Sequence, residues 1–231
     1  MRFHLITLFP DACDAYLNTS ILGRARKEKK ISVSYQNPRD FVDLPRGKAS
    51  NKWSYRKVDE RPYGGGPGMV LQALPFVKAV QKALKVGHRM SNLKRGAIVV
   101  WFSPGAKQFT NKDADALAKY SDVVIVCGRY EGIDERAAKI LKTMGTLKKY
   151  SVGNAVYTGG EVPAMAVVDA TTRRLPGILG TDESVEERRI ASRAVYTRPE
   201  TILYKKKKYR VPAVLRTGHH AKIDAWKLKR N

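Results

Sequence analysis

Residues 123–136 read VVIVCGRYEGIDER, a continuous apolar run followed by a polar loop bracketed by glycines. The apolar part, Val123 to Val126, is the pattern of a strand that is buried on both faces. The part from Cys127 to Arg136 would then form the loop at the carboxyl end of that strand, where open α/β sheets bind their ligands. We therefore take this loop as a binding-site candidate; the alternative is an ordinary turn in which Asp134 caps the next helix.

Short β-rich runs alternate with helical patterns on both sides of this strand. Such alternation predicts a mostly parallel sheet flanked by helices, an α/β fold. The other predicted strands are Phe3 to Leu8, Ile31 to Tyr35 and Ala97 to Phe102. The predicted helices are Asp11 to about Lys29, one with Leu74, Val77, Val80 and Leu84 on its apolar face, and one that begins at Thr110, with Asp113 three residues later as in a capping box.

Two more glycine-bearing segments have the same strand-end character. Ser103-Pro104-Gly105 follows the strand that ends at Phe102, and the segment from Ser151 to Pro163 holds Gly153, Gly159 and Gly160. Glycine allows a backbone to approach a ligand closely. Three such loops at strand ends favour one shared pocket over three unrelated turns.

The composition is strongly basic. Of the 231 residues, 44 are Lys or Arg and 21 are Asp or Glu, which gives a formal net charge of +23. This excess leaves three classes open: a nucleic-acid binder, a binder of anionic membranes, and a protein of a basic host proteome. Hydrophobic residues make up 43% of the chain, which argues against a disordered basic tail.

The beginning of the chain and its cysteines exclude further classes. Met1 to Pro10 is too short, and too soon followed by Asp11, for a signal peptide, and no apolar run approaches the roughly 18 residues of a membrane span. Cys13 and Cys127 are the only cysteines, so neither a disulfide framework nor a zinc site is predicted. We expect a soluble, cytoplasmic protein without a structural metal.

The stretch from Asn37 to Met69 is a long connection that ends in DERPYGGGPGM, residues 59–69. A connection of that length usually has a function. Its glycines lack the G-K-[ST] of a triphosphate loop and do not form G-x-G-x-x-G, so we reject both nucleotide readings. A tight structural turn is the remaining alternative.

The most basic part of the chain is its C-terminal part. Arg173 to Asn231 holds 16 Lys or Arg and 6 Asp or Glu, and a domain boundary is plausible after Gly180. Ala221 to Arg230 predicts a short helix with Ile223 and Trp226 on one face.

Several motifs occur in an order that closely resembles the bacterial tRNA (guanine-N1)-methyltransferases, almost from end to end. They are LFP (8–10), PRDF (38–41), DERPYGGGPGM (59–69), CGRYEGIDER (127–136), TGGEVPAM (158–165), RLPGILG (174–180), YTRPE (196–200) and HAKI-x-x-WKLK (220–229).

The resemblance implies a SPOUT fold, an α/β fold with a deep trefoil knot, plus a small, basic, mainly helical C-terminal domain. The implied domains are a knotted S-adenosylmethionine-binding domain over residues 1–172, a linker with a catalytic segment over 173–195 and a tRNA-binding domain over 196–231. The implied reaction methylates N1 of the guanosine just 3′ of the anticodon, position 37, in an obligate homodimer. S-adenosylmethionine is the implied cofactor, no motif specifies magnesium, and neither DNA nor a membrane is expected as a partner.

The resemblance also assigns roles to residues. The cofactor loops correspond to Pro104, Tyr130, Glu131, Gly132, Val152, Gly153, Tyr157, Gly159, Gly160 and Pro163. Substrate contacts are expected from Asp59, Gly65, Gly66 and Pro67. The positive charge of the C-terminal part separately predicts contacts with the RNA backbone from Lys205, Lys206, Lys207, Lys208, Arg210 and Arg216; the alternative is a solvated lysine-rich surface.

The chemistry requires a base, because guanine N1 carries a proton at neutral pH, and a carboxylate is the expected base. The negative charge that spreads to the neighbouring carbonyl oxygen calls for a guanidinium, which the resemblance identifies as Arg173; the alternative is that Arg173 only ends a helix. The family's aspartate position holds Arg188 here, so we assign the base to Glu187, with Glu186 as the alternative.

The sequence departs from the family pattern elsewhere too. The family's Ser-x-Gly-Asp-Tyr appears as SVGNA over residues 151–155, Ala106 replaces a usual glycine, residues 143–149 contain a small insertion, and the C-terminal match is short. These departures keep two alternatives open: a catalytically impaired tRNA-binding member of the same fold, and a SPOUT methyltransferase that acts on another RNA atom.

Overall fold

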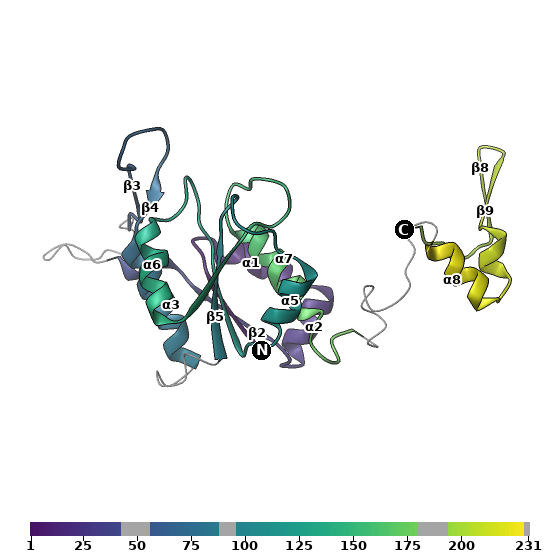
Figure 1. Cartoon of the computed structure of the whole chain (residues 1–231), viewed down its shortest axis with the longest axis horizontal. Helices are drawn as coiled ribbons and strands as arrows, with labels where there is room; N and C mark the ends of the chain where they lie inside the picture. The colour runs from purple at the N-terminus through teal and green to yellow at the C-terminus, as the bar shows by residue number, and fades with distance from the viewer. Residues whose placement is uncertain (43–55, 88–95, 180–193, 229–231) are drawn as a thin grey trace, which may run out of the picture. The chain divides into compact units, whose positions relative to one another are not determined.

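The computed structural model in Figure 1 describes residues 1–42, 56–87, 96–179 and 194–228. The chain forms two compact units, Met1–Ile178 and Leu179–Asn231, each with a β-sheet of its own. Within the described residues, no helix combines the length and the apolar character that a membrane crossing requires.

The larger unit is built on a five-stranded sheet in the order β2-β1-β6-β5-β7, and every neighbouring pair is parallel. The predicted α/β fold with a mostly parallel sheet is therefore confirmed. The strands are β1 (Arg2–Ile6), β2 (Ser32–Gln36), β5 (Ala97–Phe102), β6 (Asp122–Val126) and β7 (Thr146–Tyr150).

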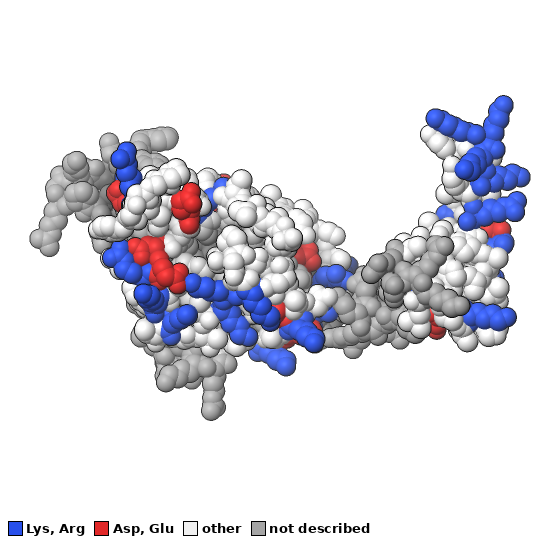
Figure 2. All heavy atoms as spheres, turned by 45° about the horizontal axis from the view of Figure 1, so that its top comes forward, with Lys and Arg blue, Asp and Glu red and all other residues white. Residues whose placement is uncertain are grey.

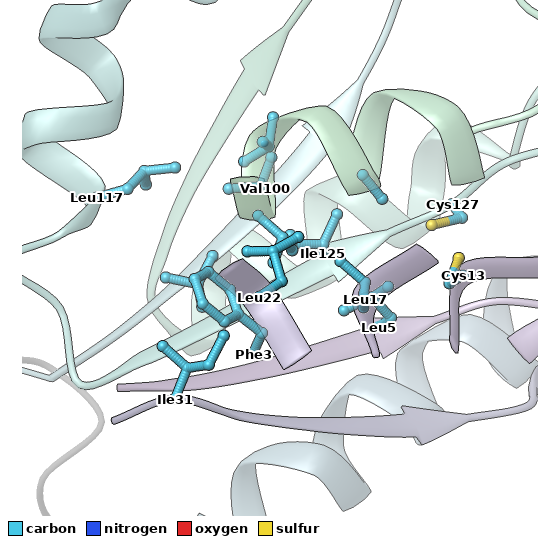
Figure 3. Packing of buried hydrophobic residues seen from close by; sticks show 14 of the residues in the cluster. Phe3, Leu5, Cys13, Leu17, Leu22, Ile31, Val100, Leu117, Ile125 and Cys127 are labelled. Carbon is cyan, nitrogen blue, oxygen red and sulfur yellow. The ribbon is translucent and has the colours of Figure 1, made fainter. Parts of the chain in front are cut away.

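Helices cover both faces of this sheet, so it has two cores (Figure 1). Because successive side chains of a strand point to opposite faces, Val123 and Ile125 of β6 lie in one core and Val124 and Val126 in the other. Burial on both faces is why these strands read as unbroken apolar runs. The first core, shown in Figure 3, is closed by α1 (Pro10–Leu17), α2 (Ser20–Lys27), α5 (Asn111–Leu117) and α7 (Glu161–Thr172), and the second by α3 (Ala73–Gly87) and α6 (Glu135–Met144).

The predicted helix from Asp11 to Lys29 is wrong in one respect, because the structure has two helices there. Asn18 ends α1 and donates a side-chain hydrogen bond back to Asp14 at 2.7 Å. Thr19 is extended, with φ −102° and ψ 156°, and starts α2. The side chains of Asn and Thr compete for the hydrogen bonds of a helix, so this pair is a natural break.

The start of α5 agrees with the sequence. Thr110 precedes the helix, and its backbone N–H donates to the Asp113 carboxylate at 3.1 Å. Asp113 also accepts from Thr110 Oγ1 at 2.7 Å and from Lys107 at 2.9 Å. The helix therefore begins with the Asp-containing capping box that the Thr110–Asp113 spacing predicts.

Asp122, the first residue of β6, links the amino-terminal ends of β6 and β1. Its carboxylate, 2% exposed, accepts from Arg2 Nε at 2.6 Å and from Ser121 Oγ at 2.9 Å, and His4 Nε2 lies 3.0 Å away. Burial alone would raise the pKa of Asp122, but the hydrogen bonds from Arg2, His4 and Ser121 outweigh it and hold this pKa well below its usual range. His4, which also contacts Ser34 at 2.7 Å, is thus a structural histidine.

The smaller unit contains a β-hairpin, a short 3₁₀ helix and an α-helix. None of its described residues, 194–228, is buried, although the rings of Tyr196 and Trp226 lie 6.2 Å apart. The hairpin is a feature that the sequence analysis does not predict. The elements are β8 (Thr201–Tyr204), β9 (Lys207–Arg210), η5 (Ala213–Arg216) and α8 (His220–Leu228).

Candidate functional site

The loops that follow β5, β6 and β7 surround one pocket of about 260 Å³ at the carboxyl end of the sheet. The sequence analysis expects these three glycine-bearing loops to share one pocket, and in the structure they do. Of the ten residues expected in the cofactor loops, Gly153 does not line this pocket but lines an adjoining hollow, to which Pro104 also contributes. The other nine line the pocket itself: Pro104, Tyr130, Glu131, Gly132, Val152, Tyr157, Gly159, Gly160 and Pro163.

Arg129 ties the loop after β6 to two other elements. Its Nε lies 3.0 Å from Oε2 of Glu161, the first residue of α7, and its Cζ lies 4.4 Å from the centroid of the Phe9 ring. The other carboxylate oxygen of Glu161 accepts from Thr7 Oγ1 at 2.7 Å. Glu161 is only 3% exposed, whereas the Arg129 side chain is 27% exposed and lines the pocket, so the ion pair connects the pocket wall to the buried start of α7.

Two glycines allow the segment before α7 to lie directly against the loop after β6. The Gly160 N–H donates to the carbonyl oxygen of Gly128 at 2.8 Å. A Cβ atom on Gly160 would lie 2.6 Å from the Cα atom of Cys127, and one on Gly159 would lie 2.4 Å from Arg129 Nε. No larger residue fits at either position without moving the backbone or the Arg129–Glu161 pair.

The DERPYGGGPGM segment is joined to the same loop by main-chain hydrogen bonds. Leu71 N donates to Gly132 O at 2.9 Å, and Glu131 N donates to Met69 O at 3.1 Å. Gly68, at φ +87°, lies so close that a Cβ atom there would be 2.6 Å from Oε1 of Glu131. The expected substrate segment and the expected cofactor loop are therefore neighbours, although about sixty residues separate them.

The ends of that segment form the short hairpin β3 (Asp59–Glu60) and β4 (Val70–Leu71), beside a cavity of about 1000 Å³. Residues 64, 65 and 66 at its tip are glycines at φ +85°, +79° and +105°, which other residues rarely adopt. Gly65, Gly66 and Pro67 are exposed. Asp59 is 8% exposed, and within the described residues its Oδ1 has no hydrogen-bond partner.

Arg173 does not line the pocket of its own chain. It follows the last residue of α7 and its N–H donates to Asp169 O at 3.1 Å. Glu161, beside the pocket, begins the same helix, and a rise of about 1.5 Å per residue puts the two Cα atoms about 18 Å apart. Glu186 and Glu187, as well as Arg188, lie outside the described residues.

The basic residues expected to contact RNA lie mostly on the β8–β9 hairpin. Lys205 and Lys206 form its turn, and Lys207, Lys208 and Arg210 lie on β9. Figure 2 shows Lys and Arg side chains gathered on this hairpin. Arg216 follows on η5, where it forms an ion pair with Glu200.

Both cysteines lie under the site as buried free thiols, side by side in Figure 3. Burial, aided by the charge of Glu161, raises the pKa of the Cys13 thiol to about 11 and also raises the pKa of the Cys127 thiol well above its usual value. Neither thiol is therefore a nucleophile at neutral pH.

The residues that the sequence analysis misses are Thr7, Arg129 and Glu161. For Arg129 and Glu161, the available signal was a charged residue directly after glycine, in C-G-R (127–129) and in G-G-E (159–161). Only the fold brings these residues together, since 32 positions separate Arg129 from Glu161.

The chemistry of the pocket is that of a small-molecule site. Among the described residues that line it, Glu131 is acidic, and Arg129 is basic but is paired with Glu161; Pro104, Val152 and Tyr157 supply apolar surface, and glycines expose main-chain groups. Such a lining suits a ligand with a flat ring and a positive charge. In the part of the chain that the structure describes, no group of three or more His, Cys, Asp or Glu residues could hold a metal ion.

Comparison with known proteins gives consistent matches. The family model described as tRNA (Guanine-1)-methyltransferase TrmD matches residues 1–231. A tRNA (guanine-N(1)-)-methyltransferase of Nitrosococcus oceani is 40% identical over 99% of this chain and 83% of its own length. Those of Buchnera aphidicola subsp. Schizaphis graminum and Moorella thermoacetica are 36% and 38% identical, over 99% and 98% of this chain and 80% and 84% of their own lengths.

Proposed function

Because the chain belongs to the TrmD family of tRNA (guanine-N1)-methyltransferases, we propose that it methylates N1 of the guanosine just 3′ of the anticodon, position 37, in tRNA, with S-adenosylmethionine as the donor. The observation that carries this proposal is the direct main-chain pairing of the Met69–Leu71 segment with the Glu131–Gly132 loop. The pairing brings a substrate segment against a small-molecule pocket, as a transfer between two bound molecules requires.

The lining of the pocket fits S-adenosylmethionine. Apolar surface from Pro104 and Val152 suits an adenine ring, and the carboxylate of Glu131 suits a positively charged sulfur. When bound, this cofactor supplies the methyl group as an electrophile.

The chain's own residues prepare the guanine. We assign removal of the N1 proton to Glu187, or to Glu186, because a carboxylate is the expected base and Arg188 occupies the family's aspartate position. The guanidinium of Arg173 stabilises the negative charge that develops on the neighbouring carbonyl oxygen. The Arg129–Glu161 pair positions the cofactor loop.

We propose that the working unit is a homodimer in which Arg173 serves the pocket of the second copy. The distance of about 18 Å along α7 supports this arrangement, because a side chain of about 7 Å cannot span it. Exposed apolar side chains on α1, α7 and the turn before α1 offer surface for a partner: Phe9 (47%), Tyr16 (45%) and Val162 (52%).

The remaining assignments extend this proposal. Lys205 to Lys208 and Arg210 contact tRNA phosphates, so affinity should fall steeply with salt. We retain the division into residues 1–172, 173–195 and 196–231, the trefoil knot in the first of these and a cytoplasmic location, where tRNA is available as the substrate.

The test is methyl transfer from labelled S-adenosylmethionine to tRNA transcripts with guanosine or adenosine just 3′ of the anticodon. We expect transfer to the guanosine transcript alone. Equal transfer to both transcripts would contradict the assigned position.

One second candidate function is favoured by a specific observation. Arg188 in place of the expected aspartate would suit a tRNA-binding protein of the same fold that has lost its chemistry. Binding of both S-adenosylmethionine and tRNA without any transfer would establish that candidate.

A further inference from the structure

The β8–β9 hairpin carries aromatic side chains that the described part of its unit leaves more than half exposed. Opposite residues of an antiparallel pair share a face, and the register pairs Ile202 with Tyr209 and Tyr204 with Lys207. One face therefore presents Ile202, Tyr204 and Tyr209, which are 57%, 60% and 51% exposed. Exposed aromatic rings on a two-stranded hairpin are a costly arrangement unless they have a binding partner.

Each of these tyrosines is accompanied by an ammonium group. Lys205 Nζ lies 5.6 Å from the centroid of the Tyr204 ring, and Lys207 Nζ lies 5.6 Å from that of Tyr209. No Asp or Glu occurs between Thr201 and Ile223. Each of the two tyrosine rings on the hairpin therefore has a lysine ammonium group beside it. A nucleotide is complementary to such a pair, because its planar base can stack on the ring and its phosphate can bind the ammonium group.

The turn of the hairpin has a backbone conformation that is unfavourable for its two lysines, so their presence there favours a functional explanation. Lys205 and Lys206 have φ angles of +47° and +62°. Two-residue hairpin turns of this kind favour Asn-Gly, because residues with a long side chain resist positive φ. Lysines persist at such positions when their charge is needed.

We propose that Tyr204 and Tyr209 form a stacking platform for unpaired bases of tRNA, while the neighbouring lysines hold the adjacent phosphates. This inference rests on the proposed tRNA substrate and adds a second mode of recognition to the charge of the hairpin. Stacking is independent of salt, whereas phosphate contacts weaken as salt rises.

An RNA strand explains this surface better than an anionic membrane does. Leu203, 66% exposed, faces away from Ile202, Tyr204 and Tyr209, because it pairs with Lys208 on the opposite face. The apolar groups are thus divided between two faces, and each face also carries a lysine. Membrane-surface segments instead gather their apolar side chains on one side.

The test measures tRNA binding by the full chain at several salt concentrations. In the variant Tyr204→Leu/Tyr209→Leu, apolar bulk remains but the rings are lost, and we expect affinity to fall about tenfold or more at every salt concentration with an unchanged salt slope. The variant Lys205→Asn/Lys206→Gly has residues that favour the turn but lacks two positive charges. We expect the slope of log affinity against log salt concentration to be shallower by about two.

Two controls make the result decisive. Tyr204→Phe/Tyr209→Phe keeps the rings and should bind tRNA as the unsubstituted chain does. Polyphosphate, a polyanion without bases, should bind the leucine variant as well as the unsubstituted chain, which also shows that the lysines are still presented.

Unchanged tRNA affinity in the leucine variant would overturn the proposal, as would an equal loss of polyphosphate binding. Loss of binding to phosphatidylserine vesicles with tRNA binding intact would point to a membrane and would overturn it too. Methyl transfer at saturating tRNA is read separately, so a failure of the platform remains distinguishable from a failure of the proposed reaction.

Discussion

Asp122 shows how a single residue can make the stability of the fold depend on pH. It lies at the start of β6 and joins Arg2 and His4 of β1 through its carboxylate. In the unfolded chain an aspartate has a pKa of about 3.9, and in the fold the pKa of Asp122 is lower. The carboxylate therefore contributes stability that is fully present above about pH 4 and is lost as pH falls through the folded pKa.

We expect Asp122→Asn to lower the free energy of unfolding by about 2 kcal/mol at pH 7, less than the roughly 3–5 kcal/mol for a fully buried pair, because Arg2 is partly exposed. The difference from the unsubstituted chain should shrink below about pH 4. Urea unfolding between pH 7 and pH 2 measures both effects. Glu60→Gln, at an ion pair with Lys57 in which the two side chains are 61% and 51% exposed, is the control and should change the stability by less than about 1 kcal/mol.

The two cysteines give a second prediction at this scale. With a pKa of about 11 for Cys13, its thiolate fraction at pH 8 is at least about a hundredfold below that of a free cysteine, and burial also raises the pKa of Cys127 well above its usual value. The folded protein should therefore react with a thiol reagent such as 5,5′-dithiobis(2-nitrobenzoate) at least about a hundredfold more slowly than the unfolded chain. Rapid reaction of either thiol in the folded protein would be incompatible with this burial.

At the scale of elements, the approach of α7 to the loop after β6 determines the shape of the pocket. Gly160 and Gly128 are in main-chain contact, and Arg129 and Glu161 join the same two segments through their side chains. The glycine contact fixes the separation of the two segments, and the ion pair fixes their relative orientation. A substitution at Gly160 should therefore change the shape of the pocket, although it removes no charge and no hydrogen-bonding side chain.

We expect Gly160→Ala to lower kcat/KM by about a hundredfold, because its Cβ atom would push the backbone near Cys127 out of place and an error of about 1 Å in a site has an effect of that size. A weaker affinity for S-adenosylmethionine, measured by calorimetry, should accompany the loss. Gly145→Ala is the matched control, since a Cβ atom there meets nothing within 4 Å and its φ of 167° is ordinary extended backbone. Equal effects of both substitutions would rule out the close-approach explanation.

Local patterns predict the elements well and their long-range partners poorly. The run from Ala97 to Phe102 is a strand over the expected residues, because burial on both faces leaves an unbroken apolar pattern. No sequence pattern predicts the Arg129–Glu161 ion pair, because the two residues lie on different elements and no periodicity relates them. The Lys205-Lys206 turn escapes prediction for the opposite reason, because its residues are unfavourable for the turn they form.

For the molecule as a whole, the position of Arg173 is the main constraint on mechanism. Family resemblance identifies the residue, but no pattern in the sequence says that it lies at the end of α7 remote from its own pocket. If one chain carried the entire site, the proposed guanidinium would be too far from the reacting atoms to act. A site shared between two copies resolves this, because a twofold axis can bring each Arg173 to the other pocket.

The proposed shared site predicts complementation between two inactive variants. Arg173→Ala removes the guanidinium, and Gly160→Ala damages the pocket, so each homodimer should lose most of its methyl-transfer activity. A mixed dimer, isolated with a different tag on each chain, would have one intact site, formed by the pocket of the Arg173→Ala chain and the arginine of the other. We expect about half the activity of the unsubstituted dimer. If each chain used its own arginine, both sites of the mixed dimer would be damaged, and an inactive mixed dimer would assign Arg173 to its own pocket or to a purely structural role.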